Sequence, residues 1–266
     1  MTAYSPTAHK NCPPQTAYCI LIAVQLAAIA IGLSVLGSLG GVLVASSFLL
    51  LGEKLRTRLV PWLVSYAVGT LVGVALIALV PEALAELPAR PAMFTMVLGI
   101  LAFFLLEKAV IWRHCHDDEA CHVHNSAASL VIIGDAFHTF VDGAVIAAAV
   151  LTSVPLGLTT ALAVAAHEIP QEVGDVAILL RAGYSRSRAF TLNVLAGAGG
   201  ILGAAAMIGA GRVVPQALPY VLAFAAGNFL YVAMADLIPD LHRGHGAGGV
   251  RQVLLIAAGV ITIALL

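Results

Sequence analysis

The stretch "AHEIPQEVGD", residues 166–175, interrupts long runs of alanine, valine and leucine with five polar side chains. Glu168, Gln171, Glu172 and Asp175 stand at positions i, i+3, i+4 and i+7, which places them on one face of a helix. His167 lies one turn before Gln171. No lysine or arginine occurs between residues 114 and 180, so these carboxylates need a partner other than a basic side chain nearby in the sequence.

Pro170 lies in the middle of this polar stretch. A proline has no N–H and its ring clashes with the preceding turn, so we expect it to free the carbonyl of Ala166 and to bend the helix beside His167. A carbonyl freed inside a membrane is tolerated only where protein or water satisfies it. The proline therefore indicates a cavity beside His167.

The composition of the whole chain is typical of an integral membrane protein. Of its 266 residues, 61% are hydrophobic and 10% are charged, and the mean hydropathy is +0.99. A helix needs roughly 20 mostly apolar residues to cross the hydrocarbon core, and blocks of about that length recur along the chain. We predict an all-α integral membrane protein with eight transmembrane helices. Their expected ranges are 20–51, 61–87, 92–112, 127–152, 156–180, 188–212, 217–240 and 250–266.

The positive residues predict the orientation, because cytoplasmic connections are enriched in lysine and arginine. With the first connection in the cytoplasm, the odd-numbered connections and their flanks contain 10 of the 13 lysines and arginines. These are Lys54, Arg56, Arg58, Lys108, Arg113, Arg181, Arg186, Arg188, Arg243 and Arg251. We therefore expect a multi-pass protein of the cell (inner) membrane. Residues 1–19 form an outward-facing segment, residues 20–266 form the eight-helix domain, and both ends face the outside or the periplasm.

A weak internal repeat relates the second and seventh helices. When "GTLVGVALIALVPEAL" (69–84) is set above "GNFLYVAMADLIPDLH" (227–242), five of the 16 positions are identical without a gap, and Glu82 stands over Asp240. These two helices should cross the membrane in opposite directions, so a true repeat is inverted, as in many transport proteins. Helices 1–3 then match helices 6–8, and helices 4 and 5 are left in the centre. Chance similarity between two glycine- and alanine-rich helices is the alternative.

The fourth helix carries a second polar stripe. In "GDAFHTFVDG" (134–143), Asp135, His138, Thr139 and Asp142 again stand at i, i+3, i+4 and i+7. If the two stripes face each other, two imidazoles, several carboxylates and an amide come together. Unpaired carboxylates are costly inside a membrane, and this ligand set suits zinc, iron, manganese or cadmium better than sodium or potassium. A single histidine of this kind is often only a packing residue, but two stripes with five acids favour a metal site.

A different cluster, "HCHDDEACHVH" (114–124), lies in the predicted connection between helices 3 and 4, residues 113–126. Its spacing matches no standard zinc finger, so we expect a flexible cytoplasmic loop that captures metal loosely, the alternative being a solvated polar loop. The residues expected to capture metal are His114, Cys115, His116, Cys121, His122 and His124. Disulfides are rare in the cytoplasm, whereas Cys12 and Cys19 lie near the outer face and can pair.

The two central stretches resemble the signatures of the ZIP (Zrt/Irt-like) family of divalent metal transporters. "HTFVDG" is similar to the family's fourth-helix His-Asn-x-x-Asp/Glu-Gly, and "HEIPQE" to the fifth-helix His-Glu-x-Pro-His-Glu of its largest branch. "GTLVGVALIALVPEA" and "AGNFLYVAMADLIPD" resemble the second and seventh helices, so the resemblance covers nearly all of the chain after residue 20. It implies eight helices in a 3+2+3 inverted-repeat arrangement and import of zinc or a similar ion into the cytoplasm.

The resemblance also implies a set of metal ligands. These are His138, Asp142, His167, Glu168 and Gln171, with Thr139 and Asn193 as contributors to a second, adjacent position. Thr139 and Gln171 stand where asparagine and histidine are usual, and Val74 and Ala78 replace an acid and a histidine that are common on the second helix. These departures leave the ion preference and the number of bound ions open.

We therefore expect a transporter of a divalent transition metal, with zinc as the first choice and iron, manganese and cadmium as alternatives. An intramembrane zinc hydrolase is the alternative from another class, since "HE" on a helix begins the H-E-x-x-H motif, but Gln171 replaces its second histidine. We expect no enzymatic activity and no prosthetic group. The expected partners are divalent metal ions and the lipid bilayer, without nucleic acid, and a homodimer is left open.

Overall fold

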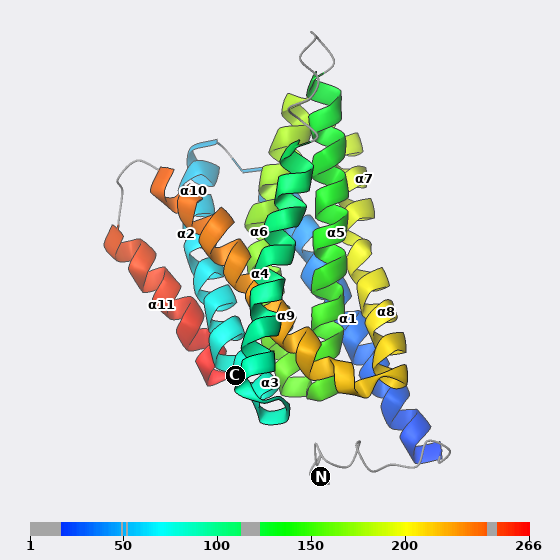
Figure 1. Ribbon diagram of the computed structural model, residues 1–266. Helices are drawn as coiled ribbons and strands as arrows, with labels where there is room; N and C mark the ends of the chain where they lie inside the picture. The colour runs from blue at the N-terminus through cyan, green and yellow to red at the C-terminus, as the bar shows by residue number, and fades with distance from the viewer. Residues whose placement is uncertain (1–16, 49, 52, 113–122, 244–248) are drawn as a thin grey trace.

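The computed structural model describes residues 17–48, 50–51, 53–112, 123–243 and 249–266, and within these the chain is almost entirely helical. Figure 1 shows the helices as one elongated bundle. The first half contains α1 (Ala17–Phe48), α2 (Glu53–Gly73), the π-helix Val74–Leu79, α3 (Val80–Glu86), α4 (Ala89–Trp112) and α5 (Val123–Thr152). The second half contains α6 (Val154–Arg181), α7 (Arg186–Gly197), α8 (Gly199–Val213), a 3₁₀ turn (Pro215–Ala217), α9 (Leu218–Tyr231), the π-helix Val232–Leu237, α10 (Ile238–Arg243) and α11 (Gly249–Leu265).

In the described residues these helices follow one another as eight rods that run alternately up and down the bundle in Figure 1. Three rods are composite, because α2 continues into α3, α7 into α8 and α9 into α10. The start of α1 and the end of α11 consequently lie at the same end of the bundle (Figure 1). The ends of α3, α5 and α8 lie at that end, and the ends of α1, α4, α6 and α10 lie at the other, as the predicted topology requires.

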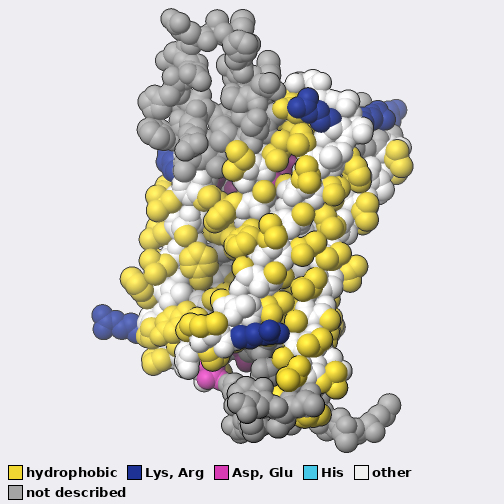
Figure 2. Space-filling model, turned by 90° about the vertical axis from the view of Figure 1, so that its right-hand side faces the viewer, with side chains coloured by type: hydrophobic (Ala, Val, Ile, Leu, Met, Phe, Trp, Pro, Cys, Tyr) yellow, Lys and Arg dark blue, Asp and Glu magenta, His cyan; other side chains and the backbone are white. Residues whose placement is uncertain are grey.

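Six of the described helical segments are long and apolar enough to cross a membrane. They are Tyr18–Ser47, Arg58–Glu86, Ala89–Lys108, Ile132–Thr152, Arg186–Val213 and Pro215–Leu237. Two further rods differ: α6 has 28 residues but carries the polar stripe, and α11 has 17 apolar residues. On the face drawn in Figure 2, lysine and arginine side chains lie toward the two ends, and the band between them is largely hydrophobic. The prediction of an all-α integral membrane protein is confirmed.

The two π-helices occupy equivalent positions in the repeat. Residues 74–79 and 232–237 are separated by 158 in number, which is the offset of the sequence alignment. Each π-helix is followed after one residue by a proline, Pro81 or Pro239, whose ring crowds the carbonyl four residues earlier. A widened turn relieves this crowding, and the N–H groups of Val80 and Ile238 accordingly bond to carbonyls five residues back. The local backbone therefore supports a true repeat.

Two helix crossings repeat the same close contact. Where α2 crosses α11, a Cβ on Gly69 would overlap the carbonyl of Ile256, and a Cβ on Gly259 would meet the carbonyl of Tyr66. Where α9 crosses α4, a Cβ on Gly227 would overlap the carbonyl of Met96, and a Cβ on Gly99 would overlap the carbonyl of Phe224. Gly69 and Gly227 are aligned in the sequence repeat. Because the two rods run in opposite directions in Figure 1, the halves form an inverted pair.

The helices α5 and α6 lie in the centre of the bundle. α5 packs against α6, α8, α1, α7 and α9, and α6 packs against α1 and α2. Gly143 and Gly203 let α5 and α8 approach closely, because a Cβ on either glycine would overlap a backbone carbonyl of the other helix. α6 runs unbroken through the buried Pro170. The two polar stripes are thus held against each other by surrounding apolar helices.

The repeated glycine crossings predict a matched pair of mutational effects. Gly69→Ala and Gly227→Ala should each lower the free energy of unfolding by roughly 1–3 kcal/mol, because the added methyl must push two backbones apart. Gly209→Ala on α8 is the control, since nothing lies within 4 Å of the place that its new methyl group would occupy and alanine favours a helix. Thermal unfolding in detergent measures all three. Equal stability of Gly227→Ala and Gly209→Ala would show that the crossing is not tight.

Candidate metal centre

Four side chains from the two central helices converge at one point. His138 and Asp142 come from α5, and His167 and Glu168 come from α6. One ligand atom from each of the four lies within 4.8 Å of the others. His138 is 6% exposed and the other three are fully buried. The structure therefore brings together four of the residues that the sequence singled out.

The nitrogen atoms of the two imidazoles point at each other. Nε2 of His138 lies 3.1 Å from Nε2 of His167, with the ring planes at 86°. Oδ2 of Asp142 lies 3.0 Å from Nε2 of His167 and 3.5 Å from Nε2 of His138. Oε1 of Glu168 lies 4.0 Å and 3.7 Å from the same two nitrogens. Two nitrogens and two carboxylate oxygens thus surround a small shared space.

The orientation of the His167 ring is fixed by a hydrogen bond on the nitrogen that faces away from the centre. Its Nδ1 lies 3.0 Å from the carbonyl oxygen of Ala163, one turn earlier in α6. A carbonyl can only accept, so Nδ1 is the protonated nitrogen and, in the neutral ring, Nε2 presents a lone pair to the centre. Histidines that bind metals usually have their other nitrogen held in this way. The hydrogen bond therefore prepares His167 as a ligand.

Aromatic side chains from two other helices pack beside the imidazoles. Phe103 of α4 lies edge to face with His138, and Phe229 of α9 with His167, each at 6.0 Å between ring centroids. Phe103 and Phe229 are both buried. These rings limit the rotation of the imidazoles.

The carboxylates of the centre lack ordinary partners. Among the described residues, neither oxygen of Asp142 or of Glu168 has a hydrogen-bond partner. Taking an unpaired carboxylate out of water costs several kcal/mol, so buried acids require a cation or a proton. Two neutral imidazoles and two carboxylates carry a charge of −2, which a divalent cation neutralises. Nitrogen and oxygen ligands in this number are the set that zinc and similar ions prefer.

A second group of acids adjoins the first. One carboxylate oxygen each from Asp135, Glu168 and Glu172 lies within 4.8 Å of the others, and all three residues are buried. The sequence placed Asp135 and Glu172 on the polar stripes but did not assign them to the metal site. Their positions three residues before His138 and four residues after Glu168 were the signal that they face the same space.

The remaining ligand predictions have different environments. Thr139 is buried and its hydroxyl lies 2.8 Å from the carbonyl oxygen of Ala196, to which it can donate, so it joins α5 to α7. Asn193, one turn before Ala196 on α7, is 1% exposed, and its Nδ2 has no partner among the described residues. Gln171 is half-buried beside His138 in the wall of an open pocket. Their participation in metal binding stays a prediction.

The loop predicted to capture metal lies largely outside the described residues. This applies to His114, Cys115, His116, Cys121 and His122. His124 lies in the first turn of α5. Of the two cysteines predicted near the outer face, Cys19 at the start of α1 is disulfide-bonded, and Cys12 lies outside the described residues.

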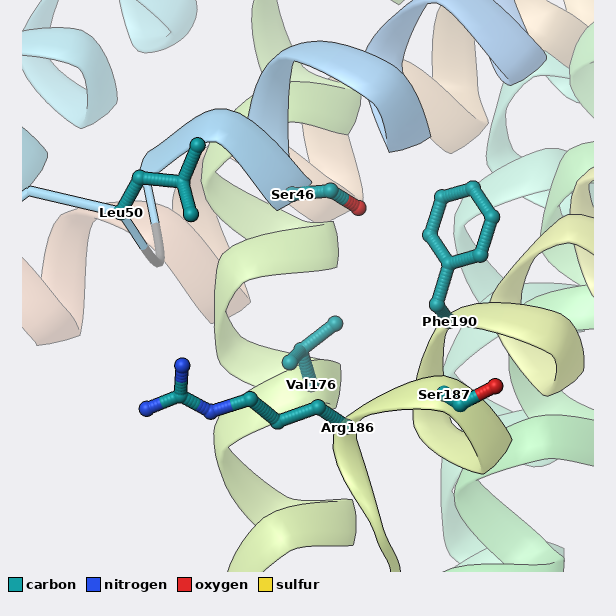
Figure 3. A pocket seen from close by; sticks show the side chains of 6 residues that line it. All are labelled: Ser46, Leu50, Val176, Arg186, Ser187 and Phe190. Atoms are coloured by element: carbon teal, nitrogen blue, oxygen red, sulfur yellow. The ribbon is translucent and has the colours of Figure 1, made fainter.

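Among the described residues, one surface hollow lies beside the metal centre and another lies away from it. The one beside the metal centre has a volume of about 190 Å³ and reaches His138 from the side of α4, α9 and the second π-helix. It is lined by Phe103, Leu106, Glu107, Gly134, His138, Gln171, Tyr231, Val232 and Asp236, and the Tyr231 hydroxyl donates to Glu107. The other lies between α1, α6 and α7, where Figure 3 shows Ser46, Val176, Arg186 and Phe190 around it. Its lining contains no histidine or carboxylate, whereas the first hollow reaches His138 of the centre.

The chain is similar to known proteins along most of its length. The sequence model of the family described as "ZIP Zinc transporter" matches residues 111–266. Zinc transporter ZIP13 of Pongo abelii is 33% identical over 235 residues, which covers 81% of this chain and 70% of that protein. Zinc transporter ZIP13 of Homo sapiens is 30% identical over 273 residues, covering 81% and 74%. Zinc transporter foi of Drosophila melanogaster is 37% identical over 138 residues, covering 51% and 19%.

The geometry of the centre predicts that zinc stabilises the folded chain. At a free zinc concentration one hundred times Kd, binding to the native state alone adds about 2.7 kcal/mol to the free energy of unfolding. Thermal unfolding should therefore move to higher temperature with zinc, and much less in a His138→Ala, His167→Ala variant. His242→Ala, which removes an exposed imidazole from α10, is the matched control and should behave like the wild type. An undiminished shift in the double variant would contradict the assignment of the centre.

Proposed function

The chain belongs to the ZIP family of zinc transporters, and we propose on this basis that it imports zinc into the cytoplasm through the centre between α5 and α6. The sequence and the family support transport of a divalent metal, and the four converging side chains support a path through this centre. We also propose that all eight rods, including α6 and α11, span the membrane. Zinc is its proposed substrate, and no prosthetic group is needed.

The observation that carries the proposal is the depth of the four ligands in the bundle. His138 is the sixteenth of the 30 residues of α5, and His167 is the fourteenth of the 28 residues of α6. Both imidazoles thus stand halfway along helices long enough to span the hydrocarbon core. A divalent ion has to shed most of its water to cross that core, and it can do so only if protein ligands replace the water. Ligands at mid-depth in an inverted repeat are the arrangement expected of a transporter.

The ligand set accounts for the choice of zinc and for its release. Two imidazole nitrogens favour zinc over magnesium or calcium, which bind oxygen ligands. The complex with Asp142 and Glu168 is neutral, so its formation does not leave a net charge inside the membrane. The open pocket beside His138 gives the ion a route out of the centre, and Glu107 lines that pocket.

The inward direction of transport rests on the distribution of charges. Lys54, Arg58, Arg186, Arg188 and Arg251 all belong to helix ends at one end of the bundle in Figure 1, the end that we propose to be cytoplasmic. Cys19 belongs to the other end and is disulfide-bonded, and disulfides persist in the periplasm and outside the cell. Both termini are therefore proposed to face outward.

Uptake of radioactive zinc into proteoliposomes tests the function directly. Loss of a residue that only positions a metal ligand typically lowers metal affinity or activity 10- to 100-fold. Asp142 is itself a proposed ligand, so Asp142→Asn should lower zinc uptake by at least about tenfold. Competition by unlabelled zinc, cadmium, iron and manganese ranks the substrates, and we expect zinc and cadmium to compete best. Glu82→Gln on α3, a carboxamide change away from the centre, should transport normally. Normal uptake by Asp142→Asn would contradict the proposed path.

Accessibility of single cysteines tests the orientation. In a background without the native cysteines, Ser187→Cys at the start of α7 should react with an impermeant maleimide only from the cytoplasmic side. Pro155→Cys at the start of α6 should react only from outside, because the two residues are exposed at opposite ends of the bundle. Labelling of whole cells against inverted vesicles distinguishes the sides. The reverse pattern would overturn the inward direction.

A further inference from the structure

The hollow between α1, α6 and α7 combines one cation, two hydroxyl groups and an apolar wall. We call it the α7 pocket; it has a volume of about 280 Å³ and lies beside the ends of α1 and α6 and the start of α7. This is the end of the bundle that is proposed to be cytoplasmic (Figure 1). The pocket is lined by Ser46, Leu50, Val176, Arg186, Ser187 and Phe190, none of which belongs to the metal centre.

The cation of the α7 pocket is Arg186, the first residue of α7. Figure 3 shows its guanidinium on one side of the pocket, below Leu50, with Phe190 on the other side and Val176 between them. Arg186 is exposed, and it forms no ion pair with any residue that the structure describes. A planar guanidinium of this kind fits a phosphate group, to which it can donate two parallel hydrogen bonds.

The hydroxyl of Ser46 also lacks a partner. Ser46 lies two residues before the end of α1, and in Figure 3 its oxygen points toward the space in front of Phe190. This Oγ atom is buried and has no hydrogen-bond partner within the described part of the chain. A buried hydroxyl without a partner is unfavourable, so a ligand oxygen in the pocket would satisfy it.

The N-terminus of α7 adds to the positive character of the pocket. Ser185 caps this 12-residue helix, and its hydroxyl accepts a hydrogen bond from the backbone N–H of Arg188. The N–H groups of Arg186 and Ser187 in the first turn have no carbonyl of the helix to bond to. The partial positive charge of these groups favours an anion on the same side as the guanidinium.

The rest of the lining is apolar and faces outward. Leu50 is 83% exposed and Phe190 is 38% exposed, so the pocket opens to the surroundings of the bundle. A cation beside exposed apolar side chains matches a phospholipid at the level where its phosphate meets its acyl chains. Ligand pockets usually have roughly 300–1,000 Å³, so a pocket of about 280 Å³ takes only the phosphate and glycerol. The acyl chains then lie along the apolar surface of the rods.

We propose that the α7 pocket binds the phosphate and glycerol of an anionic phospholipid from the leaflet at that end of the bundle. Arg186 and the N-terminus of α7 hold the phosphate, and Ser46 donates to an oxygen of the lipid. Leu50, Val176 and Phe190 contact the beginning of the acyl chains. Because the lipid contacts α1, α6 and α7 together, it stabilises the packing of these three helices.

The charge of the pocket selects the headgroup. A zwitterionic lipid carries its own ammonium group, which Arg186 and the N-terminus of α7 would repel. A lipid with a net negative headgroup has no such group, and anionic lipids are abundant in the cytoplasmic leaflet. The preferred ligand is therefore a lipid of the phosphatidylglycerol type.

Native mass spectrometry of the full chain in dodecyl maltoside tests the site. Dioleoylphosphatidylglycerol should bind the wild type more tightly than dioleoylphosphatidylcholine does. Arg186→Gln should weaken phosphatidylglycerol binding by at least about fivefold, the contribution of one arginine beside an anionic lipid surface. Arg188→Gln is the matched control on the same helix and should bind like the wild type, because its guanidinium lies 4.8 Å from the centre of the Tyr184 ring and does not line the pocket. Equal affinity of Arg186→Gln and the wild type, or equal binding of the two lipids, would overturn the proposal.

A variant that fills the pocket separates a bound lipid from general attraction to charge. Ser46→Phe keeps Arg186 but places a ring in the pocket, so it should lose both phosphatidylglycerol binding and the rise in Tm that this lipid causes in the wild type. Normal lipid binding by a folded Ser46→Phe protein would contradict the site, and if this variant does not fold, the exposed change Arg186→Gln decides.

Inorganic phosphate distinguishes a lipid from a free anion. Sodium phosphate at the same concentration should leave the Tm of the wild type unchanged, and a rise equal to that with phosphatidylglycerol would overturn the assignment to a lipid. All of these measurements are made without zinc. Their result is therefore independent of whether zinc passes through the metal centre.

Discussion

The need to neutralise buried carboxylates governs the centre of this protein. α5 and α6 carry Asp135, Asp142, Glu168 and Glu172 in the middle of the bundle, and the sequence between residues 114 and 180 contains no lysine or arginine. In a medium of low dielectric constant such charges cannot remain alone. The histidines, the freedom of the carboxylate oxygens from hydrogen bonds and the pocket beside His138 are all consistent with a cation that comes and goes.

The surrounding helices support that arrangement by close backbone packing, and the polar side chains that they bury, such as Ser38, Thr70 and Asn228, are uncharged. The crossings of α2 with α11 and of α4 with α9 rely on glycines at which a methyl group would overlap a carbonyl. The crossing of α5 with α8 uses the same device at Gly143 and Gly203. Close backbone contact replaces the hydrophobic effect as the source of cohesion inside lipid. Each half of the inverted pair also contains one π-helix followed by a proline.

The sequence predicted the features that depend on local spacing. Period and composition indicated the helices within a few residues, and the i, i+4 relation of His138 and Asp142 indicated one wall of the centre. The sequence did not predict that α2 begins at Glu53 or that α2 and α9 widen into π-helices, because crowding at Pro81 and Pro239 is resolved only in three dimensions. Nor did it assign Asp135 and Glu172, whose shared space with Glu168 depends on how α5 and α6 face each other.

The most direct test of a metal path between α5 and α6 is the position of zinc in crystals of the wild-type protein, found by anomalous diffraction at the zinc edge. We predict a peak between the two helices within about 2.0–2.2 Å of Nε2 of His138, Nε2 of His167 and carboxylate oxygens of Asp142 and Glu168. The side chains need only small rotamer adjustments to reach it. Zinc bound elsewhere in the membrane-spanning region, with these four side chains empty in a protein that transports zinc, would contradict this path.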